Sequence, residues 1–312
     1  MGGTKMMAVV FDDQFNKLAA AKKKTKGNAG AEAGLNRIGE TIAAAIKSAD
    51  LQPEDIAGIG IGSPGPLDLD RGLILATPNL GWRNVPLKAT LEKQFRCPVV
   101  VVNDVDAGTY GEYRFGAGRK NRCVLGVFPG TGIGAGCVYE GKLIRGRTGS
   151  CMELGHFPID PRGPVADVGR CGTLESMTSR LAISAQAAQA VYRGQAPALQ
   201  ALTGSRLDRI RSGALAQAIA EGDQVIETIV RHAARVLGVA VAGVVNLLAP
   251  DVLVLGGGLV EALPKLYREE VQAAIAENAM PAFAAGVKIA TAKLGDDAAT
   301  LGAAALVAGR VK

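Results

Sequence analysis

The chain has 312 residues, which is long enough for two domains that each bury a core. Hydrophobic residues make up 48% and charged residues 21%, a composition that excludes a fibrous or disordered protein and favours a soluble enzyme. The net charge of +6 suits an anionic ligand, but the basic residues are scattered. The one basic run, Lys22 to Lys26, contains no aromatic residue, so we expect it to protect an exposed strand edge rather than to bind nucleic acid.

The cysteine pattern and the apolar stretches predict the compartment. Five cysteines without a CxxC pair, together with the lack of a signal-peptide pattern, are typical of reduced thiols in the cytoplasm. The longest uncharged apolar stretch in the C-terminal half, 236–250, is too short to span a bilayer. We therefore expect a cytoplasmic protein that has neither a membrane nor a nucleic acid as its partner.

Short β-branched runs alternate with longer helical patterns, which predicts an α/β fold. Strands are predicted at 8–12, 56–62, 98–102, 123–128, 134–139, 251–257 and 287–292. Helices are predicted at 31–49, 87–95, 174–190, 223–248, 263–277 and 298–308. We place the boundary between two lobes near Gly108, so that 1–107 with 293–312 form a small lobe and 108–292 a large one.

A faint internal repeat relates the segments 2–18 and 130–146. Each has a glycine turn, then a strand, a polar turn and more extended chain. Two such segments predict duplicated α/β lobes with a phosphate held between them. Glycine turns between strands are also common by themselves, and one such turn alone would be weak support.

Polar residues follow a strand of four valines at 99–102, where Asn103 and Asp104 come directly after it. In open α/β sheets, ligands bind at the carboxyl ends of the strands. An aspartate at that place can accept the proton of a substrate hydroxyl, as phosphoryl transfer to an alcohol requires. The competing interpretation is that Asp104 caps a helix beginning near Val105.

Three glycine-rich turns have the character of phosphate sites because consecutive glycines expose backbone N–H groups. They are Gly2–Lys5 in "GGTK", Gly130–Gly132 in "FPGTGIGAG" and Gly256–Gly258 in "LVLGGGL". Elsewhere, Asn79 is a candidate hydrogen-bond partner for a polyhydroxyl ligand. Trp82 is either a stacking surface for a sugar or a core residue.

An ordered set of motifs carries a resemblance that covers nearly the whole chain. "GGTK", GxxxPGP at 60–66, "PNLGW", "VVNDVDAG", "GTGIGAG" and "ELGH" resemble the ROK family of sugar kinases, which includes bacterial ATP-dependent glucokinases. The resemblance implies the two-lobed, actin-like ATPase (ribonuclease H-like) fold, with a sugar in the cleft between the lobes.

The resemblance also implies roles for individual residues. Asp104 would be the catalytic base. The side chains that would hydrogen-bond sugar hydroxyls are Asn79, Asn103, Glu153, His156 and Glu175. The residues that would hold the nucleotide and its phosphates are Gly2, Gly3, Thr4, Lys5, Gly130, Thr131, Gly132, Gly256, Gly257 and Gly258.

The implied reaction is phosphorylation of a hexose by ATP with Mg²⁺, with glucose and its 6-hydroxyl as the first choice and a homodimer as the assembly. Fructose, mannose, N-acetylmannosamine and N-acetylglucosamine remain open as acceptors, and polyphosphate as donor. Two other functions are a sugar-responsive repressor, which would need a DNA-binding segment before the phosphate turn, and a catalytically silent sugar-binding protein.

The chain departs from the family at a zinc motif. There "ExGH" is followed by CxCGxxGCxE, whose cysteines bind structural zinc with the histidine. Here Ala166, Val168 and Thr173 take the cysteine positions, and Cys171 is out of register. Because a structural zinc site needs four ligands, we predict that zinc is absent. The loop would instead be stiffened by Pro158, Pro161 and Pro164.

A second departure lies at the start. The family motif reads Asp-Ile/Leu-Gly-Gly-Thr at the end of a first strand, and Met1 takes the Ile/Leu position. Loss of a central strand would leave unpaired backbone groups in a buried sheet, which is costly. We therefore hypothesise that the natural chain starts further upstream, and mass spectrometry showing an amino terminus at Met1 would refute this.

Overall fold

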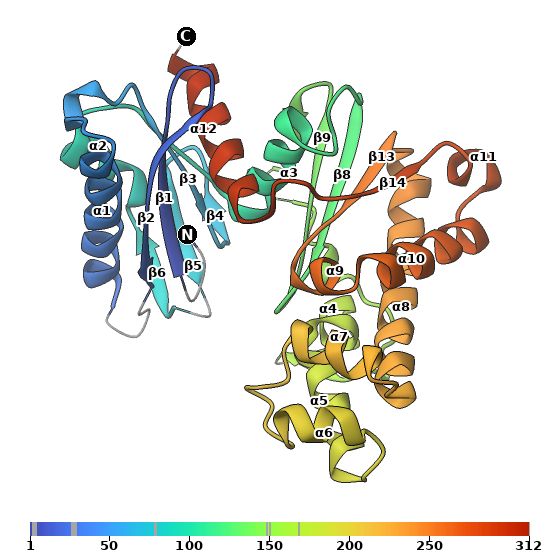
Figure 1. Ribbon diagram of the computed structural model, residues 1–312. Helices are drawn as coiled ribbons and strands as arrows, with labels where there is room; N and C mark the ends of the chain where they lie inside the picture. Colours follow the sequence, from blue (N-terminus) through green and yellow to red (C-terminus); the bar gives the residue numbers. More distant parts are fainter. Residues whose placement is uncertain are drawn as a thin grey trace. The chain divides into compact units, whose positions relative to one another are not determined.

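The computed structural model describes residues 1, 5–25, 30–77, 80–147, 149, 151–167 and 169–311. The chain divides into two compact units (Figure 1). The first comprises 1–120, 136–151 and 293–312, and the second comprises 121–135 and 152–292. The predicted boundary near Gly108 falls inside helix α3 (Asp104–Phe115), which packs against helix α12 (Ala298–Val311), and the predicted lobes stay a prediction.

The described strands within residues 1–120 of the first unit form three small sheets. One is an antiparallel pair, β1 (Lys5–Phe11) and β2 (Lys17–Lys24), and another is a parallel pair, β3 (Ile59–Ser63) and β7 (Val99–Asn103). The third is a meander of β4 (Leu67–Asp68), β5 (Leu73–Thr77) and β6 (Trp82–Val85). The four valines of β7 are all buried, as expected for a parallel strand covered on both faces.

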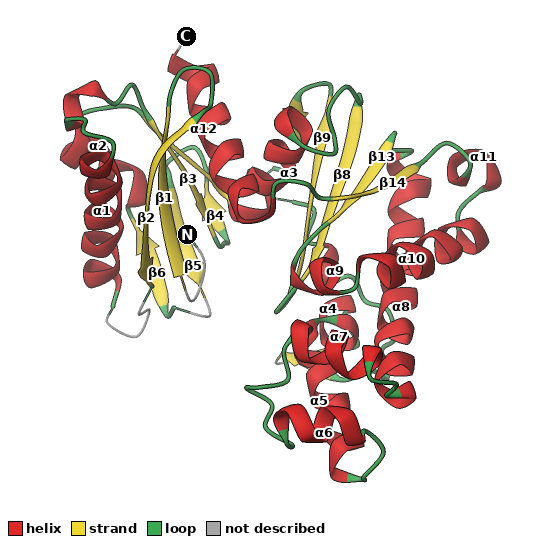
Figure 2. Cartoon of the chain, in the orientation of Figure 1, coloured by secondary structure: helices red, strands yellow, loops and turns green. Residues whose placement is uncertain are grey.

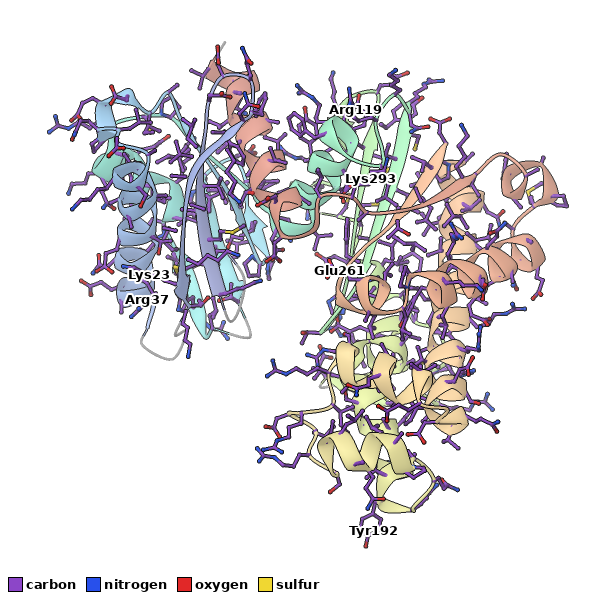
Figure 3. The ribbon with its side chains drawn as sticks, in the orientation of Figure 1. Lys23, Arg37, Arg119, Tyr192, Glu261 and Lys293 are labelled. Atoms are coloured by element: carbon purple, nitrogen blue, oxygen red, sulfur yellow. The ribbon has the colours of Figure 1, made fainter. Side chains whose placement is uncertain are left out.

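Strand β2 has the edge character that its lysines predict. Exposed and half-buried residues alternate along it, and β1 is its partner among the described strands. Figure 3 shows Lys23 beside helix α1 (Ala31–Ser48), where its ammonium pairs with the carboxylate of Glu40 at 2.7 Å. Charged side chains along an open edge oppose further strand pairing.

The core of the first unit lies between its sheets and helices α1 and α2 (Leu87–Phe95), with α1 and α12 on opposite sides of the strands in Figure 2. Short 3₁₀ turns lie at Pro53–Asp55 and Gly295–Asp297. Trp82 is only 2% exposed in this core, so the core interpretation of the tryptophan is correct.

Helices α3 and α12 approach each other through glycine. A Cβ atom on Gly302 would lie 1.8 Å from the carbonyl oxygen of Ala107, and one on Gly111 would lie 2.1 Å from that of Ala298. Only a residue without a side chain fits at such distances. This contact fixes the start of α3, and hence Asp104, relative to the rest of the first unit.

A groove with a volume of about 690 Å³ lies in the first unit. Its walls come from β1, β3 and the helices α1 and α12, and most of the lining residues are apolar. Strands β1 and β3 belong to separate sheets, so neither pairs with the other. The hypothesis of an upstream start stays a prediction.

A five-stranded sheet with the order β10-β9-β8-β13-β14 contains the strands β8, β13 and β14 of the second unit, while β10 and the larger part of β9 belong to the segment 136–151 of the first unit. The strands of this sheet are β8 (Cys123–Pro129), β9 (Ile133–Tyr139), β10 (Lys142–Leu143), β13 (Val252–Leu255) and β14 (Lys288–Thr291). Strand β13 is parallel to both β8 and β14, and β9 continues into the segment of the first unit that starts at Gly136. The hairpins β1–β2 and β9–β10, whose first strands lie in the two repeated segments 2–18 and 130–146, are both antiparallel.

The helices of the second unit are mostly C-terminal to β9. They are α4 (Leu174–Thr178), α5 (Arg180–Tyr192), α6 (Pro197–Thr203), α7 (Ser212–Ala220), α8 (Gln224–Leu248), α9 (Gly258–Ala262), α10 (Pro264–Asn278) and α11 (Pro281–Ala284). A 3₁₀ turn, η3 (Leu154–His156), and a short hairpin of β11 (Val165–Asp167) and β12 (Arg170–Cys171) precede them.

Two of these helices correct the sequence expectations. The single helix predicted at 174–190 is broken at Ser179, whose hydroxyl accepts a hydrogen bond from the Ala182 N–H and caps α5. Helix α8 is long and apolar enough to cross a membrane by length and composition, although the stretch at 236–250 is not. More than half of its most apolar window is buried, and α8 packs on α4, α5 and α10 as a core helix.

Candidate functional site

Asn103 and Asp104 lie at the carboxyl end of β7, where α3 begins. The side-chain oxygen of Asn103 accepts hydrogen bonds from the N–H groups of Val105 at 2.8 Å and Asp106 at 3.2 Å. Asn103 is therefore the helix cap, and the interpretation of Asp104 as the cap is wrong. The Asp104 carboxylate accepts one 3.1 Å bond from the Val105 N–H and keeps a second oxygen for other partners.

The surroundings of Asp104 make it a stronger base than an exposed aspartate. Burial raises the pKa of Asp104, and this effect is opposed by the nearby positive charge of the Met1 amino group and by backbone hydrogen bonds. The Met1 amino group in turn donates a 2.5 Å hydrogen bond to the Gly62 carbonyl, and burial lowers its pKa. A carboxylate with a raised pKa accepts a proton more readily near neutral pH.

The amino-terminal phosphate turn is described only at its last residue. Gly2, Gly3 and Thr4, and likewise the candidate sugar ligand Asn79, lie outside the described residues. Lys5 begins β1, and its ammonium pairs with Asp296 at 2.9 Å on the surface. The hydrogen bond from Lys5 lowers the pKa of Asp296.

In the second unit, the Glu175 carboxylate joins three predicted motifs. Its Oε2 atom accepts a 2.8 Å hydrogen bond from the Ile133 N–H, directly after the Gly130–Gly132 turn. A Cβ atom on Gly132 would lie 2.3 Å from this oxygen, and one on Gly155 would lie 2.4 Å from the Ile133 carbonyl oxygen. The glycines therefore let the phosphate turn, the "ELGH" segment and the start of α4 converge on one carboxylate.

Glu153 and His156 flank the same convergence point, one on each side of Gly155 in the 3₁₀ turn η3. The His156 Nε2 and Glu153 Oε2 atoms are 4.0 Å apart, and the two side chains are 48% and 61% exposed. Both can therefore turn to a ligand, because neither is committed to the core. The structure brings Glu153, His156 and Glu175 together in the second unit, as the resemblance implies, while their role toward a sugar stays a prediction.

The glycines at the end of β13 lie directly against the strand that leads into the Gly130 turn. Gly257 has a φ of 80°, and a Cβ atom there would lie 2.7 Å from the Pro129 carbonyl oxygen. A Cβ atom on Gly256 would come equally close to the Phe128 ring. Two of the predicted phosphate turns are thus neighbours, and helix α9 starts at Gly258.

The loop that carries the zinc motif in the family is held here by backbone hydrogen bonds. The Gly172 carbonyl accepts a 2.8 Å hydrogen bond from the Ile159 N–H, and the Gly172 N–H donates a 2.7 Å hydrogen bond to the Pro164 carbonyl. Cys171 and His156 are both exposed. Among the residues that the structure describes, no group of three or more His, Cys, Asp or Glu side chains could hold a metal ion. The absence of zinc stays a prediction.

Two polar residues were missed from the sequence. Arg180, the first residue of α5, donates a 2.9 Å hydrogen bond to the Thr131 hydroxyl. The fully buried Glu112 accepts three backbone N–H groups, at 2.8 Å from Lys293, 2.8 Å from Leu294 and 2.7 Å from Ala117. Ser179 belongs to a residue type that often caps a helix, so it indicates a helix start at Arg180. No pattern in the neighbouring sequence indicates that Glu112 is buried and accepts hydrogen bonds.

Comparisons with known proteins place this arrangement in a family. The model of the ROK family matches residues 1–310. The chain is 32% identical to a glucokinase of Thermotoga maritima, over all of this chain and 96% of the relative. It is 31% identical to a xylose repressor of Caldicellulosiruptor bescii, over 96% of this chain and 72% of the relative. A ROK family glucokinase of Streptomyces griseus, solved with glucose and AMPPNP, superposes with a TM-score of 0.83 at 32% identity, covering 98% of this chain and 96% of the other.

The chain therefore belongs to the ROK family and has the two-lobed, actin-like ATPase fold. The resemblance carried by the motifs is thereby confirmed. The predicted class of enzyme, a sugar kinase, is confirmed as well.

Proposed function

We propose that this sugar kinase transfers the terminal phosphoryl group of ATP to the 6-hydroxyl of glucose. The observation that carries the proposal is Asp104, a carboxylate with a raised pKa at the carboxyl end of a buried parallel strand. The glucokinase relatives favour glucose, and the Streptomyces griseus structure with AMPPNP favours a nucleoside triphosphate as donor.

In the proposed reaction, Asp104 accepts the proton of the 6-hydroxyl as that oxygen attacks the γ-phosphorus. The second oxygen of Asp104 is the acceptor, since the first receives the Val105 N–H. Glu153, His156 and Glu175 hydrogen-bond the other sugar hydroxyls. The N–H groups of the turns at Gly130–Gly132 and Gly256–Gly258 bind the phosphates and stabilise the charge that develops on them.

Magnesium fits this set of residues. Mg²⁺ keeps several waters and is usually bound through one or two carboxylates plus the substrate phosphates, so it needs no cage of protein ligands. Among the described residues, no group of three or more His, Cys, Asp and Glu side chains could form such a cage, and the half-buried Asp104 would be the carboxylate that holds the ion. When bound, the ion would neutralise part of the charge on the phosphates.

A coupled assay of ADP release tests the proposal, with a panel of hexoses and N-acetylhexosamines and with ATP or polyphosphate as donor. We expect glucose with ATP to give the highest kcat/KM. Asp104→Asn should lower kcat by about 10²–10⁴-fold, the usual contribution of a general base, and leave glucose affinity in calorimetry nearly unchanged. Near-normal turnover of Asp104→Asn would overturn the assignment of the base.

The xylose repressor relative favours a second candidate, a sugar-binding regulator without kinase activity. This candidate predicts glucose or xylose binding in calorimetry with no sugar-dependent ADP release. The proposed homodimer and the cytoplasmic location stay predictions, and light scattering of the purified chain tests the first of them.

A further inference from the structure

Arg180 is tied to the Gly130 turn by both its main chain and its side chain. Its N–H donates to the Gly130 carbonyl at 2.9 Å, and its guanidinium donates to the Thr131 hydroxyl at the same distance. The guanidinium has five donors, so one bond to a hydroxyl leaves most of them free. Within the described part of the chain, Arg180 forms no ion pair with a carboxylate.

A second arginine precedes a later helix of the second unit. Arg211 directly precedes helix α7, and its guanidinium donates a 3.2 Å hydrogen bond to the Asp208 carbonyl. Partial burial, and after it the positive charge of Arg211, lowers the pKa of Arg180. Like charges repel each other, and a bound anion offsets that repulsion.

Both arginines adjoin the phosphate turns. Arg180 reaches Thr131, and Ser212, which follows Arg211, has its hydroxyl 3.6 Å from the place where a Cβ atom on Gly258 would be. The turn at Gly256–Gly258 touches Phe128 and Pro129, which lead into Gly130. This part of the second unit therefore combines two glycine turns, two hydroxyls and the guanidinium group of Arg180, and Arg211 directly precedes the second hydroxyl, that of Ser212.

We propose that Arg180 and Arg211 form a clamp for a chain of linked phosphoryl groups, namely the triphosphate tail of the phosphoryl donor. The assignment rests on the proposed function, whose donor it describes. Guanidinium groups pair with phosphate oxygens in a bidentate manner, which a lysine cannot do. Arg180 is then a donor-binding residue, and the Thr131 bond orients its guanidinium toward the phosphates.

The first experiment measures binding without catalysis. Calorimetry compares inorganic tripolyphosphate, AMPPNP and AMP on the full chain and on three variants, Arg180→Met, Arg211→Met and Arg193→Met. Arg193 follows the last residue of α5 and is exposed, so its replacement removes the same charge from the same helix. We expect Arg180→Met and Arg211→Met to weaken AMPPNP and tripolyphosphate by about 10- to 100-fold, the equivalent of a charged hydrogen bond, and AMP and glucose by less than about twofold.

The second experiment is kinetic and separates the donors. Arg180→Met should raise the KM for ATP and lower kcat, and Arg180→Lys should restore only part of the loss. If polyphosphate is the better donor, the same variants should lose activity with polyphosphate more than with ATP.

Failure of the clamp and failure of the proposed function give different results. The proposed kinase function alone is refuted if the wild-type chain binds tripolyphosphate through the two arginines but phosphorylates no sugar. The clamp is refuted if Arg180→Met and Arg211→Met bind every ligand with the same affinity as Arg193→Met. This holds whatever the kinase assay shows. Lack of any tripolyphosphate or AMPPNP binding by the wild-type chain overturns the clamp too.

Discussion

Replacement of Gly132 by alanine tests whether the Glu175 carboxylate holds the second-unit site together. The new Cβ atom would lie 2.3 Å from the carboxylate oxygen, so the oxygen must retreat by about 1 Å to reach an ordinary contact of 3.4 Å. That movement breaks the 2.8 Å hydrogen bond from the Ile133 N–H. A hydrogen bond to a charged group contributes about 1.5–3 kcal/mol, and we expect Gly132→Ala to lower the free energy of unfolding by that amount.

Gly130→Ala is the matched control. It lies two residues earlier in the same turn, and a Cβ atom there would have its nearest neighbour at 4.0 Å. Neither glycine has the positive φ that would strain an alanine. The control should therefore change the free energy of unfolding by less than about 0.5 kcal/mol, the usual range for a substitution without a contact.

Urea unfolding of a double-mutant cycle with Glu175→Ala tests whether the cost of Gly132→Ala comes from the Glu175 carboxylate. Without the carboxylate, Gly132→Ala has nothing to displace, and its cost should disappear in the Glu175→Ala background. Glucose affinity should fall with Gly132→Ala and stay nearly normal with Gly130→Ala. Equal costs of Gly132→Ala in both backgrounds would refute the reasoning, because the clash would then involve other atoms.

Two further predictions concern carboxylates in the first unit. Because burial raises the pKa of Asp104 and the base must be ionised to act, kcat should fall as the pH drops through a value above 3.8, the ordinary value for aspartate. A pH–rate profile checks this, and an acid limb at or below that value would contradict it. Glu112→Gln replaces an acceptor of three backbone N–H groups by an amide with one acceptor, so it should cost about 2 kcal/mol or more in urea unfolding. Glu54→Gln at an exposed position is the control, and equal effects of the two would show that the Glu112 bonds contribute nothing.

Periodicity found the elements that are long or fully apolar. The strand of four valines in β7 and the helix at 87–95 could be predicted because each one buries a continuous face. The short strands β4–β6 were not predicted, because runs of two to five residues show too little alternation of apolar and polar side chains. The sequence predicts only the start of helix α3, near Val105, and not its length.

The site divides in the same way. Asp104 and the Gly130 turn could be proposed as site residues because a strand or a run of glycines marks them locally. The bond between Glu175 and Ile133 joins residues 42 positions apart, and the Glu112 bonds join positions up to 182 apart. No local pattern records which distant N–H group a buried carboxylate accepts, so these contacts required the fold.

The glycine contact between α3 and α12 makes the last helix of the chain a support for the proposed base. Helix α3 begins at Asp104, and a Cβ atom on Gly302 of α12 would lie 1.8 Å from the carbonyl oxygen of Ala107 in the first turn of α3. A side chain at Gly302 would therefore push that turn, and Asp104 with it, out of place. A substitution far along the chain from Asp104 should accordingly lower turnover without altering any residue that touches a substrate.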